Sequence, residues 1–229
     1  MLTLLYDDKD LVVCLKPPAV PSQPDPTSSE DMTALLARQL GLPQADLGIV
    51  HRLDRPVGGV MVYTKTKKAL SGLSQQLQSQ GFGKSYLAVC CGLPDPTEGA
   101  LSHWLLRDGR ANSSRAVNPG RAGAKEARLN YRLAAEAAPE AWGPLGLLEV
   151  QLETGRHHQI RVQLAAAGFP LWGDTKYNPL FQKRSGWFQI GLFSRSLSFS
   201  HPVTGKLMTF TAQPPEDQEP FSFFSRSGL

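Results

Sequence analysis

Short apolar runs alternate with turn-forming residues along most of the chain, and this pattern predicts more strands than helices. Two short strands are expected within residues 2–15, on either side of the turn at 7–10. A hairpin is expected from residues 188–192 and 196–200. The remaining strand candidates share the same run length and spacing, and they are 57–64, 84–91, 129–135, 145–154 and 207–212.

Three stretches instead show the three-to-four-residue apolar spacing of amphipathic helices, at 32–40, 67–80 and 159–167. Each is followed by a glycine, which readily adopts the left-handed backbone that ends helices. Serine and acidic residues at 28–31 predict where the first helix begins. Five prolines between residues 17 and 26 exclude regular structure there, because proline lacks the backbone N–H.

Strands that follow one another closely favour an α+β fold over a doubly wound parallel sheet. We therefore expect a mixed, mostly antiparallel central sheet with flanking helices. With 229 residues, of which 41% are hydrophobic, the chain is long enough to bury a sizeable core. We expect one domain over residues 1–229, with two closely packed halves as the variant.

Composition narrows the class of protein. Residues 1–10 contain three aspartates and no long apolar stretch, so they do not resemble a signal peptide. No apolar run in the sequence is long enough to span a bilayer. Three cysteines, two of them adjacent, form neither a disulfide framework nor a spaced metal site. A reduced, cytoplasmic protein without a metal is the simplest interpretation.

The net charge of +4 is concentrated in one segment. Residues 107–128 contain six basic and two acidic side chains, and glycine, asparagine and serine are frequent there. Two interpretations are equally supported at this point. A basic, mobile loop can follow the phosphates of a nucleic acid, and a solvated surface loop has the same composition.

The strongest candidate for chemistry is Asp54, in the sequence His51-Arg52-Leu53-Asp54. A carboxylate beside cationic groups stays ionised and can act as a nucleophile or base. A second polar cluster follows about a hundred residues later, at 154–161. Taken alone, Asp54 fits a turn aspartate that caps Gly58 or Gly59 at least as well.

Two motifs carry a family resemblance: His-Arg-Leu-Asp-Arg at 51–55 and Gly-Arg-His-His-Gln-Ile-Arg-Val-Gln-Leu at 155–164. Together they resemble the main motifs of the RluA-type pseudouridine synthases, which isomerise uridine within RNA. Residues 10–18, 84–89 and 173–177 match the same family in the same order. The resemblance covers about residues 5–214, and five ordered matches are much more specific than one motif.

The resemblance implies a pseudouridine synthase fold with a catalytic cleft, and a reaction that uses no cofactor, ATP or metal. It implies that Asp54 is the essential catalytic carboxylate. Arg161 would form an ion pair with Asp54, lowering its pKa and fixing its direction. Tyr86 would stack on the target base and handle the C5 proton. The plain alternatives are a phosphate-binding or surface Arg161 and a Tyr86 that packs in the sheet.

Further residues are implied in substrate binding. Arg52 would contact phosphate or fill the gap left by a flipped nucleotide, and Leu192 would line the base pocket, although a core position fits it nearly as well. His51, Arg156 and Gln159 lie in the same motifs and are expected to contact RNA. The reaction needs no histidine, so His158 and Gln159 are expected chiefly to hold a loop by hydrogen bonds, as Asp174 and Tyr177 hold the turn after Gly173.

The chain departs from the common family pattern at supporting positions. It has Val57-Gly58-Gly59 where Thr-Ser-Gly is usual, His157 where threonine or serine is frequent, and Leu192-Phe193-Ser194 where Leu-His-Ala is frequent. The catalytic side chains are retained. We expect these changes to affect rate, loop geometry or the choice of RNA.

The leading hypothesis is a monomeric enzyme that modifies a loop uridine in an rRNA or tRNA stem-loop, because flipping a base from a loop costs less than from a duplex. The catalytic domain begins almost at once, so RNA recognition is expected to come from that domain. One alternative is an inactive RNA-binding or RNA-folding protein. Another is an N-glycosidic hydrolase, which would need a second acid, with only Asp174 or Glu153 near the motifs.

Overall fold

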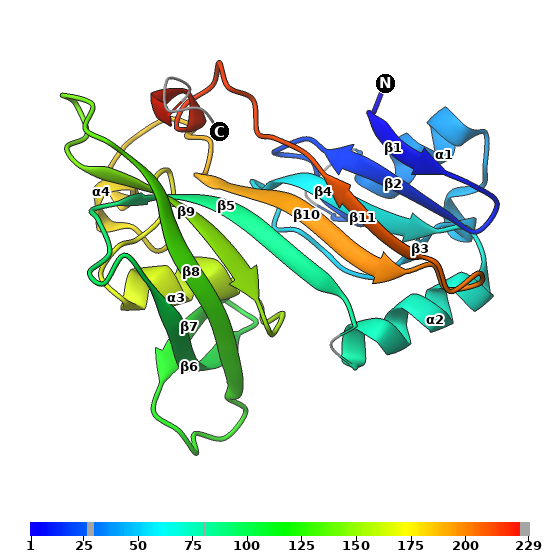
Figure 1. Cartoon of the computed structure of the whole chain (residues 1–229), viewed down its shortest axis with the longest axis horizontal. Helices are drawn as coiled ribbons and strands as arrows, with labels where there is room; N and C mark the ends of the chain where they lie inside the picture. Colours follow the sequence, from blue (N-terminus) through cyan, green and yellow to red (C-terminus); the bar gives the residue numbers. More distant parts are fainter. Residues whose placement is uncertain (27–29, 80, 225–229) are drawn as a thin grey trace. The chain divides into compact units, whose positions relative to one another are not determined.

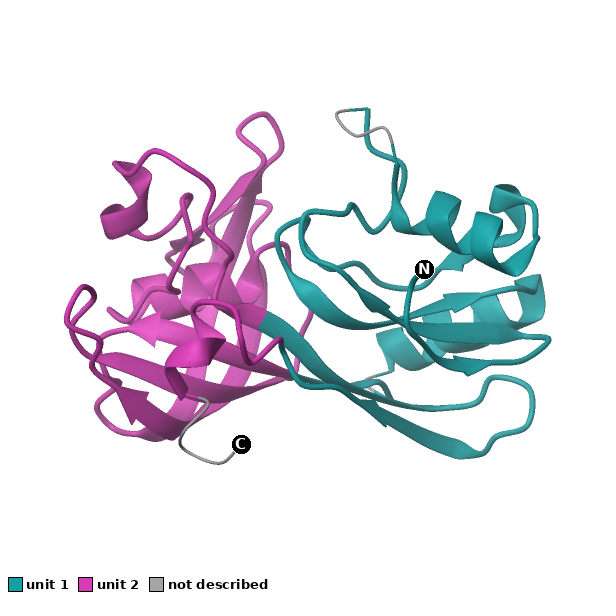
Figure 2. Ribbon diagram, turned by 90° about the horizontal axis from the view of Figure 1, so that it is seen from above, with its two compact units in different colours: residues 1–85, 193–214 teal, residues 86–192, 215–229 magenta. Residues whose placement is uncertain are grey.

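The computed structural model describes residues 1–26, 30–79 and 81–224, and the chain forms two compact units (Figure 2). The first unit holds Met1–Ser85 and Phe193–Pro214, and the second holds Tyr86–Leu192 and the tail from Pro215. The chain leaves the first unit within β5 (Gly83–Cys91) and returns at β10 (Leu192–Ser200). Among the described residues, no helix has the length and apolar character needed to cross a membrane.

The strands of the first unit form a mixed sheet (Figure 1). Strands β1 (Leu4–Asp7) and β2 (Leu11–Lys16) are antiparallel, as the sequence predicted. Strand β4 (Gly58–Thr64) pairs antiparallel with β2 and with the short β3 (Gly48–Ile49). Strand β10 pairs parallel with β4 and antiparallel with β11 (Leu207–Thr211). The first unit therefore confirms a mixed, mostly antiparallel sheet.

Two helices and a short 3-10 turn accompany this sheet: α1 (Met32–Leu40), α2 (Lys67–Gln78) and η1 (Gln44–Asp46). Asp31 caps α1 by accepting hydrogen bonds from two backbone N–H groups, and Gly41 ends it with a φ of 65°. Both helices confirm the sequence prediction, whose residues 28, 29 and 80 lie outside the described residues. One buried cluster packs α2, through Leu73, against the strands of this sheet. Its members are Leu11, Val13, Val60, Val62, Leu73, Phe82, Leu197 and Phe199.

The second unit is built on an antiparallel sheet in the order β9 (Leu145–Leu152), β8 (Lys125–Ala137), β6 (Glu98–Asp108) and β7 (Ser113–Val117). Its helical segments are α3 (Gln159–Ala166), α4 (Pro179–Gln182) and the 3-10 turn η2 (Phe221–Phe224). Strands β8 and β9 and helix α3 lie where the sequence predicted them. Together with the other elements they confirm the α+β prediction for this half of the chain.

An aromatic cluster fills part of the second unit and is defined by Trp142, Trp172, Phe181, Phe188 and Phe223. Neighbouring ring centroids lie 5.0 to 6.4 Å apart, within the range of favourable aromatic contacts. The C-terminal tail, to which the sequence alone assigns no role, contributes Phe223 to this cluster and buries Phe221 and Phe224.

The hairpin predicted from residues 188–192 and 196–200 is wrong. Residues 192–200 are the single strand β10, whose hairpin partner is β11. Gly191 has a different neighbour, since its N–H donates to Trp172 O and its carbonyl accepts from Val89 N. The glycine at 191 therefore permits a close approach to Val89, where a Cβ would lie 2.8 Å from the Val89 carbonyl oxygen.

Residues 107–128 do not form the loop that both interpretations of this segment assumed. This segment contains the end of β6, the whole of β7 and the start of β8, which pair in register, for example Leu106 with Arg115. Ser114 and Ala127 are buried, so the pairing has a side that faces the interior. The frequent polar residues reflect exposed strand positions and two turns rather than one long loop.

Candidate active site

Asp54 lies in the segment between β3 and β4, and its neighbour on the N-terminal side is firmly held. The Ser22 hydroxyl donates to Leu53 O at 2.8 Å and accepts from Leu53 N at 3.1 Å. Tyr63 in β4 in turn donates its hydroxyl to Ser22 O at 2.8 Å. Ser22 and Tyr63 are both buried, so these bonds are shielded from water.

The neighbour on the other side of Asp54 is held by Lys16, which is 1% exposed. The Lys16 ammonium donates to the carbonyl oxygens of Pro17, Val20 and Arg55, at 3.0, 2.6 and 3.1 Å. These bonds use all three protons of a charged lysine. Asp54 thus has anchored residues before and after it, and its turn closes through Val57 N donating to Asp54 O at 2.9 Å.

Burial lowers the pKa of Lys16 to about 7, although the nearby Asp54 carboxylate opposes this shift. Below pH 7 the lysine is charged in both the folded and the unfolded protein. Between about pH 7 and its ordinary value of 10.5, only the unfolded protein keeps the proton. The free energy of unfolding should therefore rise with pH in this window, by at most about 1.4 kcal/mol per pH unit from this group.

Lys16→Met is expected to remove this rise. Urea unfolding between about pH 7 and about pH 10 measures it, and exposed Lys68→Met is the matched control, which should keep the wild-type pH dependence. Parallel curves for Lys16→Met and wild type would contradict the assignment of the titration to Lys16.

The other residues of the first motif differ in exposure. His51 accepts a hydrogen bond at Nε2 from Val62 N at 3.3 Å, and its ring lies 5.6 Å from that of Phe82. Burial, with a smaller effect from Lys84, lowers the pKa of His51 to about 3, so it is neutral at physiological pH. Arg52 is exposed, with one bond at 3.4 Å to Gln23. Arg52 is therefore exposed, whereas His51 holds β4 at Val62.

The glycines after Asp54 allow close packing between strands. Gly59 has a φ of 123°, and a Cβ there would lie 2.3 Å from the Ser194 carbonyl oxygen. Gly58 and Gly59 pair with Phe193 and Ser194 of β10. These glycines therefore let the backbone of β4 approach β10 closely.

In the second unit Arg161 forms a buried, two-point ion pair with Asp174. Arg161 Nε and Nη2 donate to the two carboxylate oxygens at 2.9 and 2.8 Å, and the two side chains are 7% and 0% exposed. The Arg161 guanidinium also lies over the Tyr177 ring, 5.2 Å from its centroid. Arg161 is therefore not a surface arginine, and the sequence did not indicate Asp174 as its partner.

Asp174 also holds the turn in which it lies, as predicted. Its Oδ1 accepts from the backbone N–H groups of Lys176 and Tyr177 at 2.9 and 3.2 Å. The Tyr177 hydroxyl accepts from Ser114 N at 2.8 Å and lies 2.7 Å from His158 Nδ1. The turn after Gly173 is thereby tied both to the start of α3 and to β7.

Gln159 holds the loop before α3. Its carbonyl oxygen accepts from the Thr154 hydroxyl and from Arg156 N, at 2.8 and 2.9 Å, and its amide donates to Arg128 O at 3.0 Å. The loop-holding role expected for Gln159 is confirmed. Arg156 is exposed and donates from Nε to Glu126 O at 2.8 Å. Contact of Gln159 or Arg156 with substrate stays a prediction.

His157, which departs from the family pattern, bonds to the β6–β7 turn. Its Nδ1 lies 2.9 Å from the Ser114 hydroxyl, and its Nε2 lies 3.2 Å from Asn112 Oδ1. Its ring stacks on that of His158 at 3.8 Å between centroids. A threonine side chain at this position would be too short to reach β7, whereas the imidazole of His157 reaches Ser114.

Tyr86 and Leu192, the last two predicted site residues, also lie in the second unit. Their side chains are buried, at 6% and 5% exposed. Asp54, Arg52 and His51 belong to the first unit. The Asp54–Arg161 ion pair and the catalytic group of Asp54, Tyr86 and Arg161 therefore stay predictions. Lys16 and Ser22 were missed as supports of Asp54, although Lys16 lies in the stretch 10–18 that matches the family.

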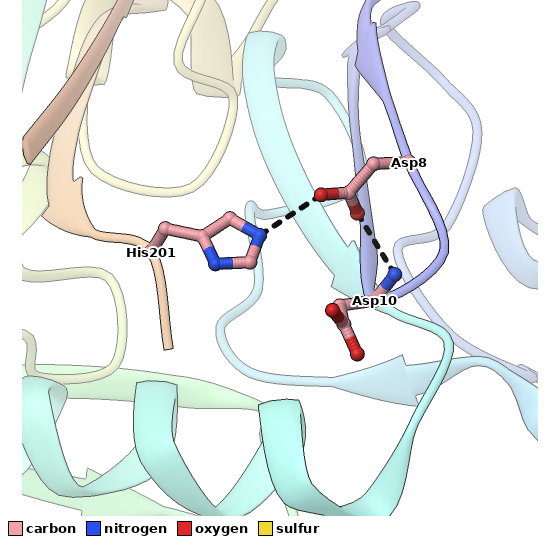
Figure 3. Close-up of side chains that lie close together, drawn as sticks. All are labelled: Asp8, Asp10 and His201. Carbon is pink, nitrogen blue, oxygen red and sulfur yellow. Dashed lines mark hydrogen bonds and ion pairs between the residues drawn. The ribbon is translucent and has the colours of Figure 1, made fainter. Parts of the chain in front are cut away.

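Asp8, Asp10 and His201 form a separate cluster in the first unit (Figure 3). His201 Nδ1 accepts from the backbone N–H groups of Val203 and Thr204, so Nε2 carries the proton and donates to Asp8 Oδ2 at 2.9 Å. Asp8 Oδ1 accepts from the N–H groups of Asp10 and Leu11 at 2.8 Å. Burial alone would raise the pKa of Asp8, but these hydrogen bonds hold it below its ordinary value. Both ring nitrogens of His201 form hydrogen bonds, so the cluster links the turn at residues 8–11 to the turn at residues 201–204.

The chain matches the family of RNA pseudouridylate synthases over residues 10–166, more than half of its length, and it belongs to that family. It is accordingly an isomerase that converts uridine to pseudouridine in RNA. An uncharacterised RNA pseudouridine synthase of Synechocystis is 32% identical to it over 234 residues, covering 100% of this chain and 70% of that protein.

Ribosomal large subunit pseudouridine synthase D of Xanthomonas campestris is 33% identical over 233 residues, covering 94% of this chain and 67% of that protein. Among solved structures, human RNA pseudouridylate synthase domain containing 1 aligns with a TM-score of 0.78 at 21% identity, over 94% of this chain and 84% of the human one. This likeness supports the same fold, the pseudouridine synthase fold that the motifs implied.

Proposed function

We propose that this isomerase acts on a uridine exposed in a loop of structured ribosomal or transfer RNA, with Asp54 as the catalytic carboxylate. The observation that carries the proposal is the double anchoring of Asp54, through Ser22 to Leu53 and through Lys16 to Arg55. A reacting group held on both sides loses little freedom when the substrate binds, which favours catalysis.

In the proposed reaction the bond between uracil N1 and ribose C1′ breaks, the uracil turns, and C5 bonds to C1′. C5 gives up a proton and N1 gains one, so no atom or electron is lost overall. Asp54 drives glycosidic cleavage, either by attack on the ribose or base or by assisting loss of the C2′ proton. Tyr86 stacks on the base and handles the C5 proton, and Arg161 directs the Asp54 carboxylate.

Substrate binding is assigned to the remaining motif residues. Arg52 is exposed, as a side chain that enters a gap in stacked bases must be. His51 links the Asp54 segment to β4 through the hydrogen bond from Val62 N, and it carries no charge at physiological pH. We further propose that the protein acts as a monomer in the cytoplasm.

Ribosomal RNA is the favoured target class, because two of the similar proteins are named for the ribosomal large subunit. Mapping pseudouridines in total RNA from cells that lack this protein tests the proposal. The expected result is the loss of one or a few sites in ribosomal loops, restored by wild-type protein and not by Asp54→Asn. Loss confined to transfer RNA would move the target to that class, and no loss in either would contradict the proposal.

A further inference from the structure

An exposed segment of the second unit, residues 182–187, is held at both ends by the aromatic cluster. Phe181 precedes it, is fully buried and stacks on Trp142 with centroids 5.3 Å apart. Phe188 follows it, and its ring lies 5.0 Å from that of Phe181 and 6.0 Å from that of Trp172. The segment between these two anchors has every residue exposed. Its two ends are therefore fixed by rings of the aromatic cluster.

Trp187 is the unusual residue of this segment, because 66% of its surface is exposed. The preceding Gly186 has a φ of 107°, a backbone conformation that redirects the chain between Ser185 and Trp187. Phe188 then points into the cluster while Trp187 faces solvent. Most tryptophans are largely buried, so a solvent-exposed indole indicates a surface that binds a partner. Leu180 in α4, at 55% exposed, adds to the apolar surface.

The segment that carries Trp187 is positively charged. Lys183 and Arg184 are exposed, and the Arg184 guanidinium lies over the Trp142 ring, 4.5 Å from its centroid. The sequence contains no aspartate or glutamate from residue 175 to residue 215. The acidic residue just before this stretch, Asp174, is buried against Arg161. An anion is therefore the complementary partner for this surface.

We propose that residues 182–187 bind a single-stranded part of the RNA substrate, with one base stacked on Trp187 and the adjoining phosphates contacted by Lys183 and Arg184. An exposed indole offers a flat face that accepts any base, and neighbouring cations follow the backbone. A protein-docking surface would instead be expected to have a contiguous apolar centre, whereas Trp187 follows Gln182, Ser185 and Gly186. This inference rests on RNA being the substrate, and it adds a contact outside the uridine that reacts.

Binding of a short fluorescein-labelled oligouridylate, followed by fluorescence anisotropy, tests the stacking contact. Trp187→Ala is expected to weaken binding about 5- to 150-fold, the range for loss of one base–aromatic stack. Trp187→Phe should retain most of the affinity. Leu207→Ala is the matched control, since Leu207 is 71% exposed on β11 of the other unit, and it should bind as wild type does. Equal affinity for Trp187→Ala and wild type would overturn the proposal.

The salt dependence of the same binding tests the phosphate contacts. Replacing Lys183 and Arg184 together by glutamine should reduce the slope of log affinity against log salt by about 1.4, since each single-strand phosphate contact contributes about 0.7. Inorganic polyphosphate, which has no bases, should bind with the same affinity to Trp187→Ala and wild type. An unchanged slope in the double variant would contradict the assignment of this surface to RNA. Self-association of the wild type in ultracentrifugation that is absent in Trp187→Ala would contradict it as well.

Catalysis separates this inference from the proposed function. With a structured RNA substrate, Trp187→Ala should raise KM and leave kcat unchanged, because the stack lies outside the reacting group. If wild type forms pseudouridine and Trp187→Ala has the same KM, the inference fails and the proposed function stands. If wild type forms no pseudouridine in any RNA, both the proposed function and this inference fail.

Discussion

Asp54→Asn is expected to abolish pseudouridine formation while leaving the protein folded. The amide has nearly the shape of the carboxylate but is neither a nucleophile nor a base of useful strength. The turn itself depends on the backbone carbonyl of Asp54, which accepts from Val57 N and is unaffected by the change. We expect kcat to fall by at least about 10²- to 10⁴-fold, the range for loss of a positioned acid–base group.

Release of tritium from C5-labelled RNA under single-turnover conditions measures this effect. The matched control is Asp46→Asn, an exposed aspartate of the same unit in η1, and it should react at the wild-type rate. Circular dichroism should show equal folding for both variants. A folded Asp54→Asn enzyme that turned over at a rate close to wild type would remove Asp54 from the catalytic group.

Asp174→Ala is expected to give the largest loss of stability. It would leave the buried Arg161 guanidinium without its two-point partner, and removing one member of a buried ion pair costs about 3–5 kcal/mol. The backbone N–H groups of Lys176 and Tyr177 would lose their acceptor as well. At roughly 2–4 °C per kcal/mol for a chain of this size, Tm should fall by on the order of 10 °C.

Asp174→Asn should lie between Asp174→Ala and wild type, since the amide oxygen still accepts from the two N–H groups but carries no charge. The control is Glu149→Ala, which breaks the exposed Arg132–Glu149 pair and should cost less than about 1 kcal/mol. Thermal and urea unfolding provide the comparison. If Asp174→Ala and Glu149→Ala lowered Tm equally, the buried pair would not be the stabilising feature inferred from its geometry.

The sequence could predict the elements whose signals are local. Helix α1 has a capping aspartate and a terminal glycine, and β1 and β2 flank a turn rich in aspartate, so neighbouring residues decide their structure. The motif around Asp54 was visible for the same reason. Its family resemblance placed the activity, which composition and spacing alone did not reach.

Other features depend on contacts between distant residues, and local patterns do not show them. Gly191 lies in a segment predicted as one strand of a hairpin, but glycine is required there because the backbone approaches Val89 closely. Asp174 was expected to hold a turn, yet nothing near it in the sequence indicates its ion pair with Arg161. Ser22 lies in a proline-rich stretch whose composition hides a hydrogen bond to Leu53, 31 residues away.

The most direct test of the central claim is the product analysis of RNA labelled with tritium at C5 of uridine. Wild-type protein is predicted to release tritium and to form an equal amount of pseudouridine, with no free uracil, whereas Asp54→Asn should bind the same RNA and do neither. Binding without tritium release by the wild type, or free uracil as its product, would contradict an Asp54-dependent isomerisation of uridine.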